Sequence, residues 1–387
     1  MWDRFSAAEM ERRYSAARAL MADHSLDALV LFGNSGVNRH NQANVFWLSN
    51  HLDLHHCYLV LPRDGEPVLL VGLANHVPNA RELSHVQQVE WGGYAPAEKI
   101  VEHVRSARRV GAVGVNATFE MGMPYAHYLE LRDRVGGIVD VTREFQGLRL
   151  VKSDEEIAWL RKAAELTDLA IAAVAEEARP GLTEAELVAI AEHAYRGAGG
   201  LPHVTFLRSM PMAAPSGCVP AQNPSRRRLA EGDVVITEFS ASYWGYSGQV
   251  HRPIFVHAEP TPEWQRLFDV AREAYDSIVA ALRPGATEAD ILASAAVISD
   301  SGYAIYDDLI HGYGVDILPP IVDRTRLSAR GGDACIVERG MAIVVQPNPI
   351  TPDERMGLQL GALTVVTDDG AESLHTVPFE PLLAVAA

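Results

Sequence analysis

A carboxylate and an imidazole stand on two neighbouring predicted strands, where they could move protons together. Glu238 lies on the first strand, and Gln249 and His251 lie two residues apart on the second, so these two side chains share a face. Burial raises the pKa of a glutamate, and an imidazole titrates near neutrality, which makes the two groups an effective acid/base pair. The spacing therefore predicts acid/base catalysis, with a structural ion pair as the alternative.

A second imidazole and a second carboxamide follow later in the chain. His311 stands in the glycine-rich stretch IHGYGVD, where the backbone bends sharply or approaches another group closely. A core histidine that is hydrogen-bonded to backbone is the alternative. Gln346, in MAIVVQPN, can orient a carbonyl or an amidine but cannot carry a proton. We expect Glu238, His251 and His311 to be catalytic and Gln249 and Gln346 to bind substrate.

The elements that position these groups begin with a hairpin over residues 232–255, GDVVITEFSASYWGYSGQVHRPIF. Val234 and Ile236 alternate with polar residues before the turn, and Val250 and Ile254 do so after it. The residues between the two runs, Tyr243-Trp244-Gly245-Tyr246, are typical of a turn. Glu238 and His251 therefore belong to one antiparallel pair of strands.

The chain divides near residue 150. Short apolar strands at 28–33, 57–62, 67–72 and 109–115 alternate with amphipathic helices and predict an α/β domain over residues 1–150. Ser153 and Glu156 then form the S-x-x-E pattern that begins a helix. We expect a second domain over residues 151–387.

The second domain contains an internal repeat. RPGLTEAELVAIAEHAYRGAG, from Arg179, aligns with RPGATEADILASAAVISDSGY, from Arg283, at an offset of 104 residues. In each copy Pro-Gly ends one helix, and Thr183 or Thr287 can cap the next. Two similar halves indicate a duplicated α+β domain.

The chain resembles the creatinase, prolidase and methionine aminopeptidase family. The resemblance rests on the hairpin, the HGYG motif, the M-x-x-x-x-Q-P motif and the internal repeat. The resemblance covers essentially all 387 residues. It implies an α+β fold, with an α/β amino-terminal creatinase-like domain followed by a duplicated pita-bread catalytic domain.

In the metal-using members of that family, acids stand at the positions of Glu238, Gln249, Gln346 and Gly361. Amide side chains supply no negative charge to offset two divalent ions. We therefore expect no dinuclear metallopeptidase centre, no bound metal and no cofactor.

The resemblance to creatinase also implies further substrate contacts. Its A-H-N-P histidine is matched by Gln222, and its two carboxylate-binding arginines fall near His55 and Arg324. Tyr246, beside the hairpin turn, could line the pocket. The predicted substrate-binding residues are thus Gln222, Gln249, Gln346, Tyr246, Arg324 and His55.

These features predict a metal-independent, creatinase-like hydrolase of a non-peptide C–N bond in a small amino-acid-like, amidine or cyclic amide metabolite. Because the pocket lacks several of the family's acids, a substrate less cationic than creatine is expected. Two alternatives remain. One is a lyase, dehydratase or isomerase, either metal-free or with a single metal on Glu238, His251 and His311. The other is a non-catalytic binding module.

The composition limits the kinds of partner that the protein is expected to bind. With 33 basic and 50 acidic residues the net charge is −17, which disfavours nucleic acid and anionic membrane. No apolar run has the length of a membrane span, and the charged amino terminus predicts a cytoplasmic protein. Cys57, Cys218 and Cys335 have no CxxC spacing and predict structural thiols. The resemblance implies a homodimer with the substrate pocket at the subunit interface.

Overall fold

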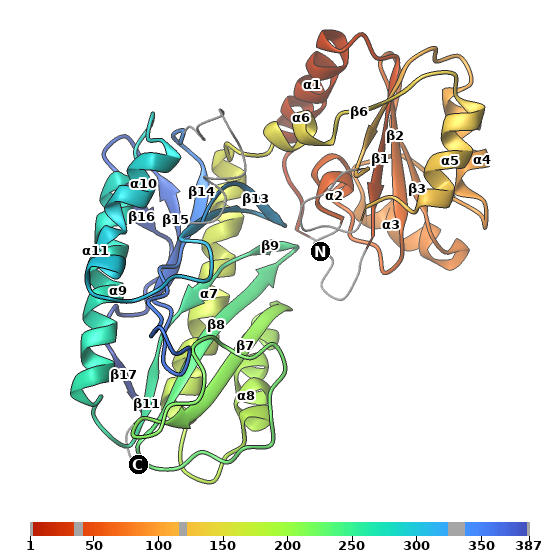
Figure 1. Ribbon diagram of the computed structural model, residues 1–387. Helices are drawn as coiled ribbons and strands as arrows, with labels where there is room; N and C mark the ends of the chain where they lie inside the picture. The colour runs from red at the N-terminus through yellow and green to blue at the C-terminus, as the bar shows by residue number, and fades with distance from the viewer. Residues whose placement is uncertain (1–2, 35–41, 116–121, 324–336, 385–387) are drawn as a thin grey trace. The chain divides into compact units, whose positions relative to one another are not determined.

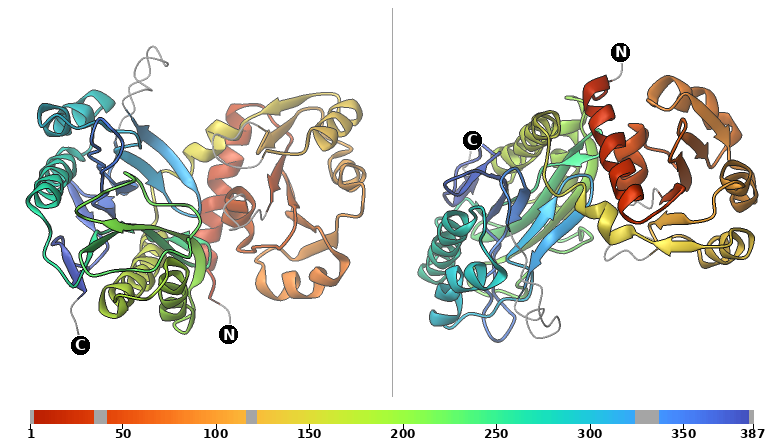
Figure 2. Two further views of the ribbon diagram at one scale, coloured as in Figure 1. Left: turned by 60° about the horizontal axis from the view of Figure 1, so that its bottom comes forward. Right: turned by 90° about the horizontal axis from the view of Figure 1, so that it is seen from above.

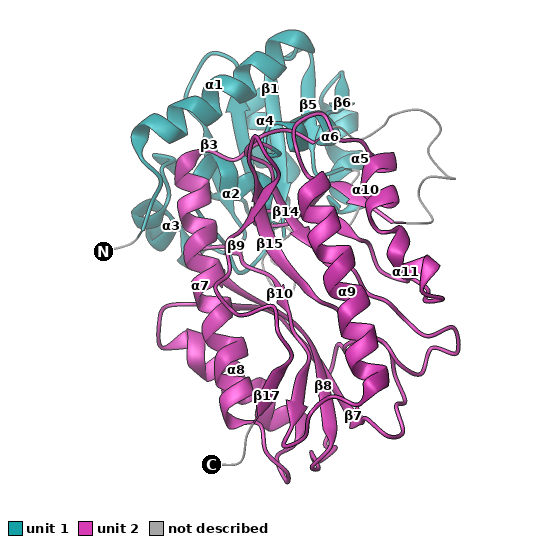
Figure 3. Ribbon diagram, turned by 90° about the vertical axis from the view of Figure 1, so that its left-hand side faces the viewer, with its two compact units in different colours: residues 1–150 teal, residues 151–387 magenta. Residues whose placement is uncertain are grey.

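The computed structural model describes residues 3–34, 42–115, 122–323 and 337–384. The chain forms two compact units, Met1–Leu150 (unit 1) and Val151–Ala387 (unit 2), which are coloured separately in Figure 3. Among the described residues, no helix has both the length and the apolar character needed to cross a bilayer.

Unit 1 is built on a six-stranded sheet within its described residues, in the order β4-β3-β2-β1-β5-β6. Strand β2 runs antiparallel to β1 and β3, whereas the β1–β5, β5–β6 and β3–β4 pairs are parallel. The strands are β1 Ala28–Gly33, β2 Cys57–Pro62, β3 Val68–Val71, β4 Gln88–Trp91, β5 Val110–Val113 and β6 Ile138–Asp140.

Helices cover both faces of this sheet. Alternate β1 residues serve two separate cores: Leu29 and Leu31 pack with α1, α2, α3 and α6, and Val30 packs with α4 and α5. Figure 1 shows these helices around the sheet. The helices are α1 Ala7–Asp23, α2 Ala43–Ser49, α3 Val77–Leu83, α4 Pro96–Val104, α5 Tyr125–Arg134 and α6 Thr142–Gly147, with a 3-10 turn at Ala74–His76.

Unit 2 begins with a long helix whose start follows from local sequence. Ser153 accepts a hydrogen bond from the Glu156 amide, and the Glu156 side chain accepts one from the Ser153 amide. Thr183 and Thr287 form the same reciprocal cap at the two copies of the repeat. The helices are α7 Asp154–Glu177, α8 Glu184–Arg196, α9 Pro262–Ala281, α10 Glu288–Ser294 and α11 Ala296–Asp300.

Within the described residues, the sheet of unit 2 has eleven strands. Its path runs β13-β12-β14-β15-β10-β8-β11-β17, with β16 on β15 and with β7 and β9 on β8. The strands are β7 Leu201–Pro211, β8 Asp233–Tyr243, β9 Tyr246–Ser247, β10 Val250–His251, β11 Ile254–Val256, β12 Ile310–Tyr313, β13 Ile317–Val322, β14 Ala342–Val345, β15 Gly361–Val366, β16 Ala371–Ser373 and β17 Leu382–Ala384.

The helices of unit 2 lie along different parts of this sheet, with α7 and α8 beside β7 and β8, and α9 beside β14 and β16. Figure 2 shows the two groups of helices in yellow-green and cyan. Trp264 and Leu267 of α9 pack with Val234 and Ile236 of β8. The central strands are therefore fixed by buried apolar contacts, and the polar side chains between them are held in place.

A tight turn closes the predicted hairpin after β8. Trp244 and Gly245 both have positive φ, 48° and 89°, and join Tyr243 to its ladder partner Tyr246. Two residues with positive φ give the turn that matches the twist of paired strands. The hairpin prediction is confirmed, although the second strand is divided into β9, β10 and β11.

Candidate active site

Glu238 and Gln249 meet across the hairpin. Val250 of β10 is the ladder partner of Phe239 in β8, and this register puts the two polar side chains beside each other. Gln249 donates from Nε2 to Glu238 Oε1 at 3.0 Å. The same Nε2 lies 3.4 Å from both His251 Nε2 and Gln346 Oε1. One carboxamide thus links three of the other predicted site residues.

Two further glutamines each donate to an aspartate. Gln346, which follows β14, donates from Nε2 to Asp308 Oδ1. Gln359, which precedes β15, donates from Nε2 to Asp307 Oδ2 at 2.8 Å. Together with the pair of Glu238 and Gln249, three carboxylates each accept a hydrogen bond from a neutral glutamine side chain. Hydrogen bonds from amides satisfy lone pairs but leave the charge in place.

The carboxyl group of Glu238 is surrounded by protein atoms, and the residue as a whole is half-buried. This desolvation, followed by the negative charges of Asp307 and Asp308, raises its pKa to about 8. Glu238 therefore carries its proton over much of the neutral range. A carboxyl with such a pKa is suited to proton transfer near physiological pH.

His311 lies on β12, where the register with β13 shifts between His311 and Gly312. A side chain at Gly312 would place its Cβ 2.3 Å from the Pro319 carbonyl oxygen, so the close approach requires glycine. Burial lowers the pKa of His311 to about 4. The imidazole is neutral at pH 7, and with Nδ1 3.2 Å from the Gly312 oxygen it donates there and keeps a lone pair on Nε2.

His251 is fully buried between two strands and faces Gly361. Burial, followed by the nearby His311 and Arg252, lowers its pKa well below the ordinary value. A Cβ at position 361 would lie 2.8 Å from His251 Nδ1 and 2.3 Å from the Val345 oxygen. His251 thus occupies the space into which a side chain at 361 would extend.

The remaining predicted contacts are not brought into this group. Tyr246 is buried, and its hydroxyl donates to Glu156 Oε1 at 2.6 Å while its ring packs against Trp159, so it anchors the start of α7. Gln222 is exposed in the connection between β7 and β8. His55 lies in unit 1, just before β2, and its role stays a prediction. Arg324 lies outside the described residues.

Sequence reasoning missed Asp307, Asp308 and Gln359. The two aspartates stand in the connection before β12, which has no periodic pattern. Gln359 comes just before a buried strand, where a polar residue is ordinary and does not indicate a functional site. The available signal was the Asp-Asp pair that ends three residues before His311.

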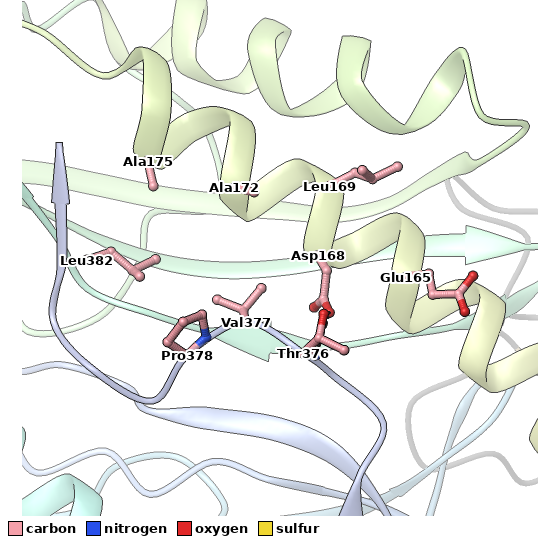
Figure 4. A pocket seen from close by; sticks show the side chains of 9 residues that line it. All are labelled: Glu165, Asp168, Leu169, Ala172, Ala175, Thr376, Val377, Pro378 and Leu382. Carbon is pink, nitrogen blue, oxygen red and sulfur yellow. Dashed lines mark hydrogen bonds between the residues drawn. The ribbon is translucent and has the colours of Figure 1, made fainter. Parts of the chain in front are cut away.

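A separate hollow of about 630 Å³ lies on α7, lined by Leu169, Val377, Pro378 and Leu382 together with two acids (Figure 4). One of these acids, Asp168, accepts from His375 Nδ1 at 2.6 Å and from the Thr376 amide at 2.6 Å. Burial opposes its ionisation, but these hydrogen bonds outweigh it and lower the pKa of Asp168. Asp168 thus ties α7 to the segment before β17.

Family models match both units. The Creatinase/Prolidase N-terminal domain matches residues 13–151. The model described as metallopeptidase family M24 matches residues 158–368, more than half of the chain. The chain belongs to metallopeptidase family M24. The predicted fold, a creatinase-like amino-terminal domain followed by a pita-bread domain, is confirmed.

Relatives match over nearly the whole chain. A probable dipeptidase, PepE, of Mycobacterium tuberculosis is 29% identical over 386 residues, covering 97% of each chain. An Xaa-Pro dipeptidase of Pyrococcus horikoshii is 25% identical over 362 residues, covering 92% of this chain and 94% of the relative. These relatives are named for cleavage of peptide bonds.

Solved structures of the family share the fold. Dipeptidase PepE from Mycobacterium ulcerans superposes with a TM-score of 0.79 at 24% identity, covering 99% of this chain and 100% of that one. The prolidase from Pyrococcus horikoshii gives 0.79 at 22% identity, covering 95% and 99%. At these identities the likeness shows the fold.

The predicted function requires correction. A creatinase-like, metal-independent hydrolase of a non-peptide C–N bond was expected, but the relatives are named dipeptidases and Xaa-Pro dipeptidases. The lyase and binding-module alternatives are not favoured either. The prediction relied on the missing acids and gave too little weight to the similarity along the whole chain.

The donors in this M24 site do not fit a pair of divalent ions. Of the four positions at which the metal-using members carry acids, Glu238 alone is an acid here. Gln249 and Gln346 are amides, and Gly361 has no room for a side chain. Among the described residues, no three His, Cys, Asp or Glu side chains are arranged to hold a metal ion. Hard divalent ions require several anionic oxygens around one point.

Proposed function

We propose that this M24 protein hydrolyses the peptide bond of a small peptide. The relatives named dipeptidases, which match along the whole chain, support the bond type. The structural observation that carries the proposal is the link from Glu238 through Gln249 Nε2 to His251. The carboxyl of Glu238 keeps its proton there, and burial keeps the imidazole of His251 neutral. Peptide hydrolysis needs a group that accepts a proton and a group that donates one.

His311 and Glu238 belong to one connected set of side chains. The His311 ring packs edge-on against Tyr313, with ring centroids 5.2 Å apart. Burial, with a smaller contribution from the charge of Glu238, raises the pKa of that tyrosine. Asp307 affects the pKa values of both Glu238 and His311. These two groups can therefore act on a single substrate.

We assign the base to His311 and the acid to Glu238. The lone pair on His311 Nε2 takes a proton from water while the water oxygen bonds to the peptide carbonyl carbon. The carboxyl of Glu238 gives its proton to the peptide nitrogen as the C–N bond breaks. Transfer of the proton from His311 back to Glu238 restores both groups, and the balance is one water and one peptide bond to one acid and one amine.

His251 is assigned a positioning role. It is fully buried, and its Nε2 lies 3.4 Å from Gln249 Nε2, where the neutral imidazole accepts a hydrogen bond. This contact holds Gln249 against Glu238. Replacing His251 by Ala is expected to lower kcat through misplacement of Gln249, and replacing it by Gln should recover part of the loss.

The proposal includes the absence of a dinuclear metal centre, on the basis of the donor set and the filled space at Gly361. The purified protein should bind fewer than two equivalents of divalent metal per chain. Two equivalents of bound metal, with activity lost on chelation and restored by the ion, would contradict this part of the proposal.

The test is a panel of dipeptides with and without proline in the second position, with amino acid release measured by mass spectrometry. Glu238→Gln and His311→Gln should each lower kcat by at least about 100-fold. His193→Gln, on the exposed face of α8, removes an imidazole away from the site and serves as the control. Release of no amino acid from any peptide would reject the proposal.

The homodimer with a pocket at the subunit interface, the cytoplasmic location and the contacts of His55, Gln222 and Arg324 remain predictions. Sedimentation of the purified protein tests the first of them. For the three side chains, alanine variants should raise KM rather than lower kcat, since each is expected to hold the substrate rather than react with it.

A further inference from the structure

Asp307 and Gln359 form a polar pair beside the proposed catalytic groups. Gln359 is 2% exposed, and its Nε2 donates to Asp307 Oδ2 at 2.8 Å. Asp307 keeps partial exposure, and its Oδ1 accepts from the Asp308 amide at 2.9 Å. Asp307 is thus partly open to solvent, whereas Gln359 is not.

The oxygen of Gln359 has no hydrogen-bond partner. Because a carboxylate can only accept, the amide must turn its N–H group toward Asp307, which fixes the position of Oε1. That oxygen is buried and unpaired in the structure. A buried acceptor without a donor is costly, and such an atom commonly marks a bound group.

The charge of Asp307 is also uncompensated by the neighbours that surround it. Desolvation and the charge of Asp308 raise the pKa of Asp307 to about 6, and no lysine or arginine of the described residues is among the groups that shift it. Arg252, the buried arginine nearest in sequence to the site, is engaged by backbone oxygens. His311 is neutral.

We propose that Asp307 and the Gln359 oxygen bind an organic cation with several N–H donors, an ammonium or guanidinium group of the substrate. This inference rests on the proposed peptide hydrolysis and names the chemical group recognised next to the reacting bond. A carboxylate and an amide oxygen both accept hydrogen bonds, and Asp307 adds negative charge, so a ligand that contacts both supplies donors and positive charge together.

A metal ion would not suit this subsite, because its ligands must converge on one point. Among the described residues, no three acid, imidazole or thiol side chains converge in that way. The N–H groups of an organic cation point in separate directions and can reach acceptors that lie apart. Because several of the family's acids are missing, the sequence predicted a substrate less cationic than creatine. Asp307 and Asp308 supply negative charge at positions that the expectation did not include.

The experiment measures binding by calorimetry with three probes that share an n-butyl chain: n-butylamine, n-butylguanidine and the uncharged pentanamide. The variants are Asp307→Asn and Gln359→Met, with Glu372→Gln on exposed β16 as the matched loss of one charge. The cations should bind the wild-type protein at least about tenfold more tightly than pentanamide, and Asp307→Asn should remove that difference. Gln359→Met should weaken cation binding by about threefold or more, and Glu372→Gln should leave it unchanged.

Cation binding that is equal in wild type and Asp307→Asn, or no tighter than pentanamide binding, would overturn the inference, as would no binding of any probe. The comparison of probes on the wild-type protein decides the matter even where a variant fails to fold. Two peptides then distinguish the source of the cation. Glycyl-phenylalanine offers only an α-ammonium, and N-acetyl-glycyl-lysine offers only a side-chain ammonium.

Failure of this inference is distinct from failure of the proposed function. The amine probes are not hydrolysed, so their binding is independent of turnover. Peptide hydrolysis that persists unchanged in Asp307→Asn would uphold the function and reject the cation subsite.

Discussion

The imidazole of His251 fills the space opposite Gly361, its partner on the neighbouring strand. A Cβ at position 361 would lie 2.8 Å from His251 Nδ1 and 2.3 Å from the Val345 oxygen. The second contact involves backbone, so rotation of a side chain cannot relieve it. An acid at 361 would require the two strands to separate.

The first prediction concerns this contact. Gly361→Ala should lower the free energy of unfolding by about 1–3 kcal/mol, because overpacking at a buried strand forces the backbone to move. Gly197→Ala is the control, since a Cβ there meets nothing within 4 Å. Urea denaturation of both variants measures the difference, and equal stability of the two would show that the strands adjust freely.

The second prediction concerns the stability of the protein against pH. The pKa of Glu238 is raised from 4.5 to about 8, so its stabilising contribution is fully present below pH 4.5 and is lost as pH rises through 8. Glu238→Gln cannot ionise and avoids this loss. Its Tm should exceed that of the wild type by a few degrees, about 3 °C, at pH 9 and by little at pH 5. If the difference in Tm between the two proteins were the same at pH 5 and pH 9, the ionisation of Glu238 would not be the cause of the pH dependence.

The third prediction is a bell-shaped dependence of kcat/KM on pH. Activity requires neutral His311, whose pKa is about 4, and protonated Glu238, whose pKa is about 8. The acid limb should fall below pH 4 and the alkaline limb above pH 8. In the residual activity of Glu238→Gln the alkaline limb should disappear. Retention of that limb would assign it to another group.

The fourth prediction tests the anchor of α7. Asp168→Ala removes the acceptor for His375 Nδ1 and for the amide and hydroxyl of Thr376, and should cost about 2–4 kcal/mol of stability. Glu165→Ala, one turn earlier on the same helix and exposed, should change stability by less than about 0.5 kcal/mol. Denaturation curves of the two variants give the comparison. Similar losses of stability would show that alanine at either position destabilises helix α7, whether or not the hydrogen bonds of Asp168 are removed.

Local patterns predicted much of the fold. The four apolar runs of the amino-terminal half became β1, β2, β3 and β5, and the caps at Ser153, Thr183 and Thr287 begin helices α7, α8 and α10. These features depend on interactions between residues that are close in the sequence, so the sequence alone is enough to predict them. The short strands β4 and β6 had no comparable pattern.

The site was harder to predict because its members come from distant stretches. The contact between Glu238 and Gln249 follows from hairpin register, and it could be expected from alternation alone. Asp307 and Gln359 are 52 positions apart and meet only after the sheet has formed. The role expected for Tyr246 depended on its place beside the turn, but the register directs its hydroxyl to Glu156.

Arg252 links parts of unit 2 that are made at different times. Its guanidinium is fully buried and donates to the backbone oxygens of His251, Gly361, Val377 and Pro378. A growing chain that has reached residue 300 already contains this arginine and lacks three of those oxygens. Unit 1 is contiguous in sequence and can fold while synthesis continues, whereas the sheet around Arg252 can close only after residue 378 has been added.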